Sequence, residues 1–356
     1  MFEDVQCSLS RLQQWEQGYV LGLLQSAHKT PSAIAASGTI GYSPSYSCRL
    51  LRQEAKPHQS SRERRLEAAP KGMYLGVDLV PVAHQGCWIE GVDRVYSSSD
   101  KAPVWGHNLL SCGLVGYGKL PYPLSLEGFP TKPMSSEVYP YRTPGEAMWQ
   151  VVEAIRKNGN GYSLAGVVFD NQFAGKAYLA KLYQHNIPFV ARARLNQKVE
   201  HAGKQRSIRE LGEHYPPGKA RYYKRFGWYV KRIKITLADV GRLDMLLIWL
   251  PQPAGFKLMA LFSTLDAGIQ EVLAAWKARW DLERVHRLLK QNLGLSKCLS
   301  RSYAAQLKHA DLAIEALHLI RQQKQLHPDL SWRTAQHNAA KTLKSQLLTV
   351  LPALSA

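Results

Sequence analysis

Cysteines, acidic residues and long apolar runs are all scarce in this chain of 356 residues. Its five cysteines are scattered and none forms a C-x-x-C pair, so the sequence indicates neither a zinc ribbon nor a disulfide framework. No run approaches the roughly 18 apolar residues of a membrane-spanning helix. The first ten residues lack the basic and apolar regions of a signal peptide. We therefore expect a protein of the reducing cytoplasm that makes no use of a membrane.

The shortage of acidic residues leaves a large positive charge. Lys and Arg number 46 against 27 Asp and Glu, which gives a formal net charge of +19. The chain is 45% hydrophobic and 21% charged, an ordinary composition for a folded protein, so the excess charge does not indicate disorder. A surplus of this size favours phosphate polymers or anionic membranes as partners, and the lack of a membrane segment favours nucleic acid. A basic surface without any partner is the simpler alternative.

Two regions of different character follow each other along the chain. Residues 1–66 predict short helices, because RLQQWEQGYVLGLLQSA carries apolar residues at helical spacing and turn residues follow it. A helix-turn-helix and a plain three-helix packing unit both fit this pattern. The polar, basic stretch 52–72 is predicted to be a linker. Residues 67–345 alternate apolar strands with amphipathic helices, which predicts an α/β core.

The stretch from about 196 to 256 interrupts this alternation. It reads as antiparallel strands in which cations and aromatic residues alternate, and we expect a β-rich insertion into the core. Cations there could meet phosphates while aromatic rings stack on unpaired bases. An ordinary cationic sheet face with aromatic residues packed behind it fits equally well. The residues of this stretch expected to contact DNA are Lys224, Arg225, Trp228, Lys231 and Arg232.

Two aspartates follow strongly apolar runs, Asp78 in YLGVD and Asp170 in GVVFD. An unpaired carboxylate buried inside a strand costs several kcal/mol. At the C-terminal end of a strand it can project into the crevice where α/β sheets bind their ligands. Each aspartate could equally be the turn residue that ends a strand. With a third carboxylate they could hold two hard divalent cations, and Mg²⁺ fits because no Cys/His cluster favours a softer ion.

The third carboxylate, Glu283, lies in WKARWDLERVHRLLKQNLGL, residues 276–295, which reads as one unbroken amphipathic helix. On such a helix Trp276, Arg279, Arg287 and Lys290 fall within roughly 40° of Glu283. One acid between cations suits a site that handles a metal and phosphates together. The alternative is a set of ordinary surface ion pairs between Glu283 and the arginines four residues to either side.

The spacing Trp276-x2-Arg279-x3-Glu283-x6-Lys290 resembles the Y-x2-R-x3-E-x6-K signature of a large class of bacterial insertion-sequence transposases. Together, Asp78, Asp170 and Glu283 resemble the DDE triad of transposases that have an RNase H-like core. The stretch VVFDNQFAGKAYLAKLYQHNIPFVARAR is similar to the region around the second Asp of that class. The resemblance extends from about residue 18 to about residue 320.

The chain departs from this class at two places. The Tyr of the signature is replaced by Trp276, which lacks the phenol that can bond a phosphate. Asp78 is followed by two apolar residues where many members have a second Asp and a Thr. Asp93 and Asp100 are therefore rivals for the first position of the triad, although both lie in polar, loop-like sequence.

The resemblance implies an RNase H-like mixed sheet flanked by helices, with the β-rich insertion between the second Asp and the Glu. It also implies a DNA transposase that binds the terminal inverted repeats of its element as double-stranded DNA, cuts with metal-activated water and joins the freed 3′ ends to target DNA. Asp78, Asp170 and Glu283 would hold two Mg²⁺ ions, for which Mn²⁺ could substitute. Trp276, Arg279, Arg287 and Lys290 would contact DNA near the cut.

A homodimer on paired ends is also implied, since joining two ends usually takes two active sites. Two competing hypotheses keep the same core. One is a structure-selective nuclease that cuts DNA without strand transfer. The other is an inactive relic retained as a DNA-binding protein.

Overall fold

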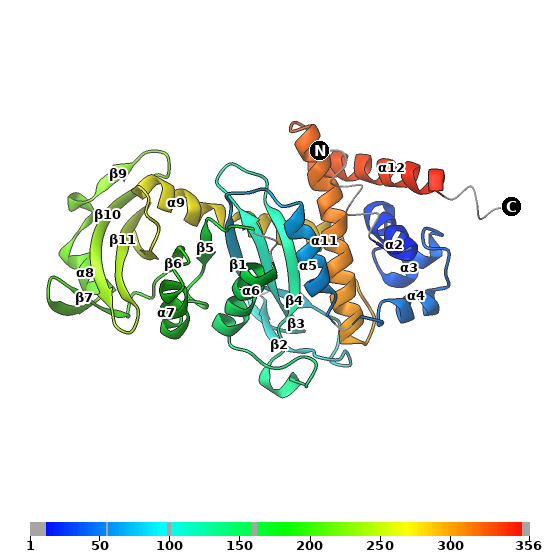
Figure 1. Cartoon of the computed structure of the whole chain (residues 1–356), viewed down its shortest axis with the longest axis horizontal. Coiled ribbons are helices and arrows are strands. Elements are labelled where there is room, and N and C mark those ends of the chain that lie inside the picture. The colour runs from blue at the N-terminus through cyan, green and yellow to red at the C-terminus, as the bar shows by residue number, and fades with distance from the viewer. Residues whose placement is uncertain (1–11, 55, 98–100, 159–161, 351–356) are drawn as a thin grey trace.

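In the computed structural model, residues 12–54, 56–97, 101–158 and 162–350 are described. Across these ranges one twelve-stranded mixed sheet runs through the molecule, with a strand-rich end, a helix-covered centre and a helical end (Figure 1). No helix in these ranges is both long and apolar enough to span a bilayer.

The central strands form the mixed sheet that the resemblance implies. They are β1 (Tyr74–Ala83), β2 (Asp93–Ser97), β3 (Ala102–Val115), β4 (Tyr122–Gly128), β5 (Gly166–Phe169) and β6 (Phe189–Arg192). β1 is antiparallel to β3 and parallel to β5, and β5 is parallel to β6. β2 and β4 both pair with the other edge of β3. The antiparallel strands come first in the chain and the parallel strands follow, joined by a helical crossover.

The region after β6 is rich in strands, and these strands extend the central sheet. They are β7 (Lys198–His201), β8 (Lys204–Ser207), β9 (Arg221–Tyr223), β10 (Trp228–Leu237), β11 (Gly241–Gln252) and β12 (Gly255–Ser263). β12 pairs with β6, and the order continues through β11, β10, β7 and β8, while β9 pairs with β10. The short helices α8 (Ile208–His214) and η2 (Pro217–Lys219) lie in the same region. The hairpin strand β12 continues seven residues past the predicted end at 256 and returns the chain to the core.

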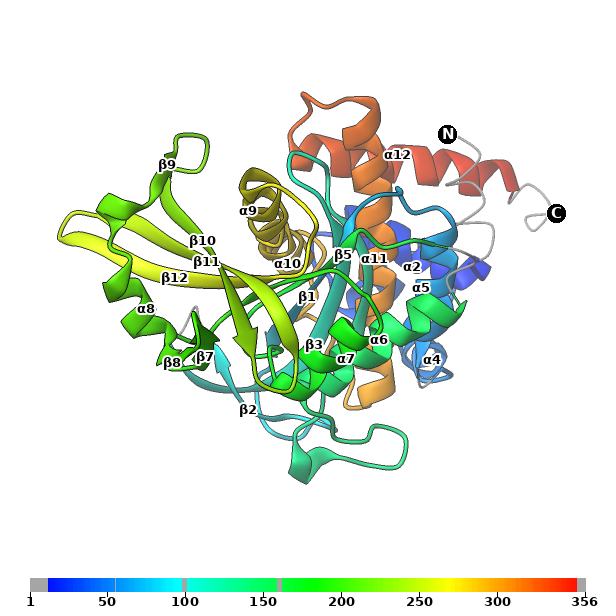
Figure 2. The ribbon, with the colours of Figure 1, turned by 60° about the vertical axis from the view of Figure 1, so that its left-hand side comes forward.

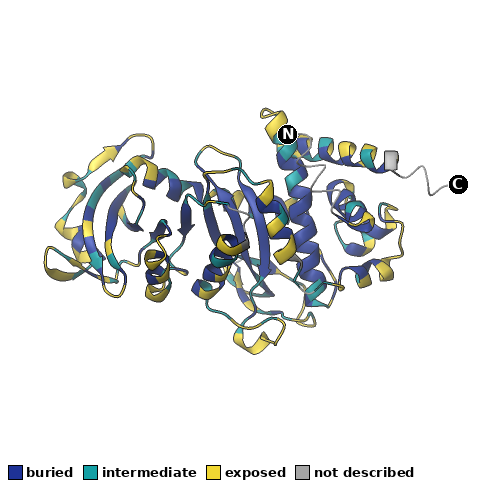
Figure 3. Cartoon of the chain, in the orientation of Figure 1, coloured by how far each residue is buried: buried dark blue, intermediate teal, exposed yellow. Residues whose placement is uncertain are grey.

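Helices cover both faces of the central strands (Figure 2). On one face lie α6 (Pro144–Asn158) and α7 (Lys176–Gln184), and on the other lie α9 (Ile269–Ala278) and α10 (Asp281–Gln291). In β5, Val167 and Phe169 pack on the α6 side while Val168 packs on the α9 side. Such strands are buried on both faces, which explains their continuous apolar sequence (Figure 3). A single turn, η1 (Lys132–Met134), lies between β4 and α6.

The helices near the start of the chain pack against those near its other end (Figure 1). They are α2 (Gln14–Gln25), α3 (Pro31–Ala36) and α4 (Pro44–Leu50), joined in one apolar cluster with α11 (Tyr303–Leu326) and α12 (Trp332–Val350). The expected helices are therefore present in the described part of residues 1–66. α2 buries most of its residues, Tyr19 and Leu23 completely, so this helix serves packing.

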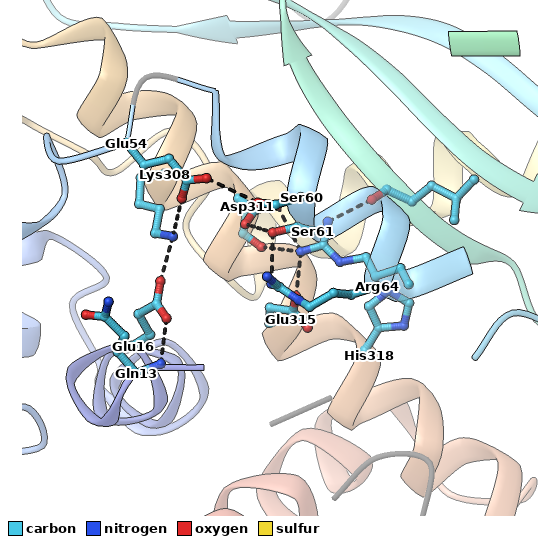
Figure 4. Close-up of polar contacts among 12 residues, drawn as sticks. Gln13, Glu16, Glu54, Ser60, Ser61, Arg64, Lys308, Asp311, Glu315 and His318 are labelled. Atoms are coloured by element: carbon cyan, nitrogen blue, oxygen red, sulfur yellow. Dashed lines mark hydrogen bonds and ion pairs between the residues drawn. The ribbon is translucent and has the colours of Figure 1, made fainter. Parts of the chain in front are cut away.

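The predicted linker at 52–72 is wrong, because residues Pro57–Glu67 form helix α5. Its arginines are not solvated: Arg65 is 2% exposed, pairs with Asp311 at 2.9 Å and with Glu315 at 2.8 Å, and donates to the Leu124 carbonyl. Arg62 pairs with Glu127 on β4. These charges bind α5 to α11 and to the sheet edge, and Figure 4 shows how the acids of α11 point into the cluster.

Candidate active site

The pairing of β1 with β5 places Asp78 and Asp170 at the same level. The parallel ladder ends at Val77 opposite Phe169, and the two aspartates are the next residues on each strand. Since side chains alternate across a strand, both project to the face that carries α9 and α10, as Val168 does. The prediction that Asp78 ends its strand is wrong, because β1 continues to Ala83. Only the ladder to β5 ends there.

Helix α10 brings Glu283 to the same face. Its Leu282 lies against Gly76 of β1 and Gly113 of β3, where a Cβ on Gly76 would sit 2.9 Å from Leu282 Cδ1. The missing side chains let the helix approach the sheet closely, as glycine allows. The neighbouring Glu283 side chain is 59% exposed and stands at the edge of this contact.

Arg279 links the first and third carboxylates. Its Nη1 lies 3.3 Å from Asp78 Oδ2, and its Nη2 lies 3.9 Å from Glu283 Oε1. The Arg279 side chain is buried, whereas the signature predicts a phosphate contact for it. Asp170 has a looser cationic neighbour, Arg192 at 3.7 Å, and accepts a hydrogen bond from the Asn171 amide at 2.6 Å.

The three carboxylates affect one another electrostatically. Burial raises the pKa of Asp78 above its ordinary value, and repulsion from Asp170 and Glu283 raises it further. The Arg279 guanidinium and the Leu79 amide, which donates at 2.9 Å, oppose this rise. The carboxyl of Asp78 thus lies in an environment that disfavours its charge until a cation compensates it.

The donor atoms suit a hard cation, although the side chains are not closed around one. Three carboxylates supply only oxygen ligands, which Mg²⁺ and Mn²⁺ accept. Within the described ranges, no three His, Cys, Asp or Glu side chains form a group ready to hold a metal. The guanidinium of Arg279 lies where a positive charge is needed, between Asp78 and Glu283.

The unbroken helix predicted for residues 276–295 is wrong. α9 ends at Ala278, α10 begins at Asp281, and Arg279 and Trp280 form a turn between them. Tight bonds make this turn: the Leu282 amide donates to the Arg279 carbonyl at 3.0 Å, and the Glu283 amide donates to the Trp280 carbonyl at 3.1 Å. α10 then ends at Gln291. The break turns Arg279 inward and leaves Glu283 in the first turn of a new helix.

Two of the residues expected to contact DNA have buried side chains. Trp276 is 1% exposed and Trp228 is 6% exposed, and both belong to the apolar cluster between α9 and the sheet. Arg232 is also used within the fold, where it donates to Asp244 at 2.8 Å and to the Ala267 carbonyl at 2.8 Å. These side chains stabilise the strand-rich end of the sheet.

The remaining predicted cations are accessible. Arg287, Lys224 and Arg225 are exposed, and Lys231 and Lys290 are half-buried. Arg225 lies over the Tyr117 ring at 4.4 Å, and Lys231 lies near the Tyr215 ring at 5.7 Å. Of the aromatic residues beside these cations, Tyr223 and Phe226 are buried and Tyr222 is 50% exposed.

Asp93 and Asp78, two candidates for the first aspartate of the triad, lie at different distances from Asp170. Asp93 opposite Gly106 and Asp78 opposite Ser111 are five residues apart along β3, about 17 Å. Asp93 also accepts a hydrogen bond from the Thr131 hydroxyl at 2.5 Å. Asp100 lies outside the described residues. Of the two described candidates, only Asp78 neighbours Asp170.

Three residues near the carboxylates are not predicted from the sequence. Gln172 donates to Asp78 Oδ1 at 3.3 Å, and Arg192 at the end of β6 faces Asp170. Both follow from the strand order, since Gln172 comes two residues after Asp170 and β6 lies beside β5. His286 on α10 has its pKa lowered to about 3, mainly by burial, so its ring is neutral at physiological pH.

An RNase H-like sheet with two aspartates on adjacent parallel strands and a glutamate on the covering helix defines a DDE-type nucleotidyl-transfer fold. Residues 140–317, half of the chain, match the family described as transposase DDE domain. The chain belongs to this family, which confirms the resemblance seen in the sequence. The matched range contains Asp170 and Glu283 and begins after Asp78.

Among solved structures, the chain is similar to the piggyBac transposase in a cryo-EM structure of its synaptic complex with hairpin DNA. The TM-score is 0.49 and the sequence identity 14%, over 83% of this chain and 57% of that one. The chain thus spans little more than half the length of that relative. No curated protein matches the chain.

Proposed function

We propose that the chain is a DNA transposase that binds the ends of its element, cleaves DNA and joins the 3′ ends to a target. One observation carries the proposal: Asp78, Asp170 and Glu283 lie on the same face of the sheet, with Arg279 bridging two of them, in a member of the transposase DDE family. The net charge of +19 supports DNA as the substrate.

Each side chain has a role in the proposed chemistry. Asp78, Asp170 and Glu283 would hold two Mg²⁺ ions, or Mn²⁺ in their place, which when bound supply an activated water or 3′-hydroxyl and stabilise the leaving oxygen. Arg279 keeps the first and third carboxylates together without metal. Its guanidinium, between Asp78 and Glu283, would also be the cation placed to bind a phosphate beside the cut. Arg287 and Lys290, on the same helix as Glu283, would position the DNA backbone.

The finer points of the proposal concern partners. The substrate would be double-stranded DNA, the terminal inverted repeats and a target, and the acting form would be a homodimer on paired ends. The work would take place in the cytoplasm, where bacterial DNA lies. A structure-selective nuclease would cut the same DNA without joining 3′ ends. A relic would bind DNA without metal and never cut it.

The first experiment replaces Glu283 with Gln, which removes a metal ligand and keeps the shape of the side chain. We expect Glu283→Gln to abolish cleavage of an element end and to leave end binding within about twofold. Glu213→Gln, an exposed acid on α8, is the matched control and should cleave normally. Normal cleavage by Glu283→Gln would contradict the assignment. Joining of a labelled 3′ end to plasmid DNA then separates a transposase from a nuclease.

The second experiment removes the charge of Lys290. If Lys290 contacts a phosphate, Lys290→Ala should weaken binding to all DNA sequences alike and reduce the log–log salt slope by about 1. The slope is measured by fluorescence anisotropy between 50 and 300 mM salt, about the range in which such contacts are lost. A slope equal to that of the unsubstituted protein would return Lys290 to the surface ion-pair interpretation.

A further inference from the structure

A basic groove lies between α2, α10 and α12, outside the carboxylate site. It has a volume of about 800 Å³ and is lined by the end of α2, by Gln291 and Asn292 at the end of α10, and by α12. In the described part of the chain, no Asp or Glu lines this groove. Its cationic and titratable lining residues are Lys29, Arg333, His337, Lys341 and Lys344.

Helix α12 presents these cations because its other face is used for packing. Ala335, Ala339, Leu343 and Leu347 are buried against α2 and α11. The exposed positions 333, 337, 341 and 344 are spaced by four, four and three residues, which places them along one side of a helix. The sequence of α12, WRTAQHNAAKTLKSQLLTV, contains no acidic residue. Helical packing therefore produces a stripe of one sign on the solvent side.

Lys29 shows that the groove lacks an internal counter-charge. The amine is half-buried, and burial lowers its pKa to about 8. An anion held in the groove would reverse this effect and favour the charged amine. The electrostatics of the groove therefore match a ligand that brings negative charge with it.

The groove continues a line of cations that starts at the carboxylate site. Arg287 and Lys290 follow Glu283 on α10, and Gln291 at the edge of the groove lies about 12 Å from Glu283 along the helix axis. This distance corresponds to about four base pairs, since successive phosphates of a strand rise about 3.4 Å along DNA. The end of α10 meets the stripe itself, since Asn292 donates to Gln336 Oε1 at 3.3 Å. From Arg333 to Lys344 the stripe spans about 16 Å along α12, roughly the length of five base pairs.

We infer that the α2–α10–α12 groove binds the phosphate backbone of duplex DNA, beginning about four base pairs from the cut, through Lys29, Arg333, Lys341 and Lys344. The inference rests on the proposed function, because it takes DNA held at Glu283 as its starting point. The groove reads no sequence. It fixes the direction in which the duplex leaves the active site.

The test removes two charges from the stripe and, as a control, two from α6, which covers the face of the sheet opposite α10. Lys341→Gln/Lys344→Gln is compared with Arg156→Gln/Lys157→Gln on α6, which packs on the other face of the sheet. Binding to a 30-base-pair element end is followed by fluorescence anisotropy at several salt concentrations. The stripe variant should bind at least about tenfold more weakly at 0.1 M salt and lose about 1.8 from its salt slope. The α6 variant should change neither quantity by more than its error.

A second duplex separates the groove from the active site. On an end trimmed to four base pairs beyond the cut, the stripe variant and the unsubstituted protein should bind equally well. An equal loss on both duplexes, an unchanged salt slope, or an equal effect of the α6 variant would each overturn the inference. Thermal unfolding of both variants identifies a loss that comes from misfolding, which would also show as equal weakening on both duplexes.

The outcomes keep the two proposals apart. If the unsubstituted protein cleaves and Glu283→Gln does not, the proposed function stands whatever the stripe variant does. A stripe variant that binds normally then overturns the groove alone. If the unsubstituted protein binds no duplex at any salt, the proposed function fails, and the groove fails with it.

Discussion

Replacing Arg279 with Gln should make the stability of this protein depend strongly on divalent metal. Arg279 lies 3.3 Å from Asp78 and 3.9 Å from Glu283, and it is the cation that keeps these acids together without metal. Gln keeps most of the side-chain volume and removes the charge. The carboxylates then face one another, and Asp78, whose pKa is already raised, becomes still harder to ionise.

The structure sets the size of the effect. The Asp78 side chain is 17% exposed, and breaking a largely buried ion pair costs about 3–5 kcal/mol. The pair with the well-exposed Glu283 adds at most about 1 kcal/mol. Protonation of Asp78 limits the loss: taking up a proton at pH 7 from an ordinary pKa of 3.8 costs about 4 kcal/mol. We therefore expect Arg279→Gln to lower the free energy of unfolding by about 2–4 kcal/mol in metal-free buffer.

Urea unfolding with EDTA and with Mg²⁺ measures this prediction. Metal at 100 times its dissociation constant adds about 2.7 kcal/mol to a protein that binds it only when folded. The variant should gain more from metal than the unsubstituted protein does, because a bound cation would supply the positive charge that Arg279 supplies to Asp78 and Glu283. Lys157→Gln, which breaks an exposed pair with Glu153 on α6, is the control and should cost less than about 1 kcal/mol. Equal stability of Arg279→Gln and unsubstituted protein in EDTA would refute the reasoning.

The pKa of His309 is lowered by burial to about 4 from an ordinary 6.5, so the unfolded chain takes the proton first and stability falls as pH drops from 6.5 towards 4. The loss is about 2 kcal/mol at pH 5, and urea titrations of His309→Gln at pH 7 and pH 5 should show a smaller difference than the unsubstituted protein. Gly76→Ala should push Leu282 away from the sheet, cost about 1–3 kcal/mol and slow cleavage, whereas Gly218→Ala, with open space around it, should do neither in thermal unfolding and cleavage assays. Arg65→Met removes the closest cation of two buried acids of α11, leaving Arg64 at 3.7 Å from Glu315, and should cost about 3–5 kcal/mol in urea unfolding; a loss below 1 kcal/mol would contradict the buried network.

Local patterns of the sequence predicted the core of the fold well. The apolar runs before Asp78 and Asp170 became adjacent parallel strands, since strands buried on both faces must be apolar throughout. Glu283 lies on an amphipathic helix above these strands, because the neighbouring apolar residue Leu282 packs on the sheet. The sequence immediately around these residues is enough to predict their structure.

Most of the failures involve partners distant in the chain. The linker prediction took the polarity of α5 as a sign of exposure, yet Arg65 is neutralised by acids about 250 residues away. The sequence around Trp276 predicts a continuous helix, because no Gly or Pro in it marks the turn at Arg279 and Trp280. For Trp228, alternation along β10 gives two faces but does not tell which of them α9 covers. A polar segment whose side chains pair with distant polar residues has the same local sequence pattern as a segment exposed to solvent.

The packing of α2 on α11 and α12 has a consequence for how the chain folds during its synthesis on the ribosome. The Tyr19 hydroxyl lies 2.8 Å from Nδ1 of His309, 290 residues later in the chain. At about 5–20 residues per second, synthesis of that interval takes roughly 15–60 s. Throughout this time α11 and α12 are not yet available, so the apolar side of α2 lacks its native packing partners. A nascent chain therefore completes this packing only when translation has passed α12.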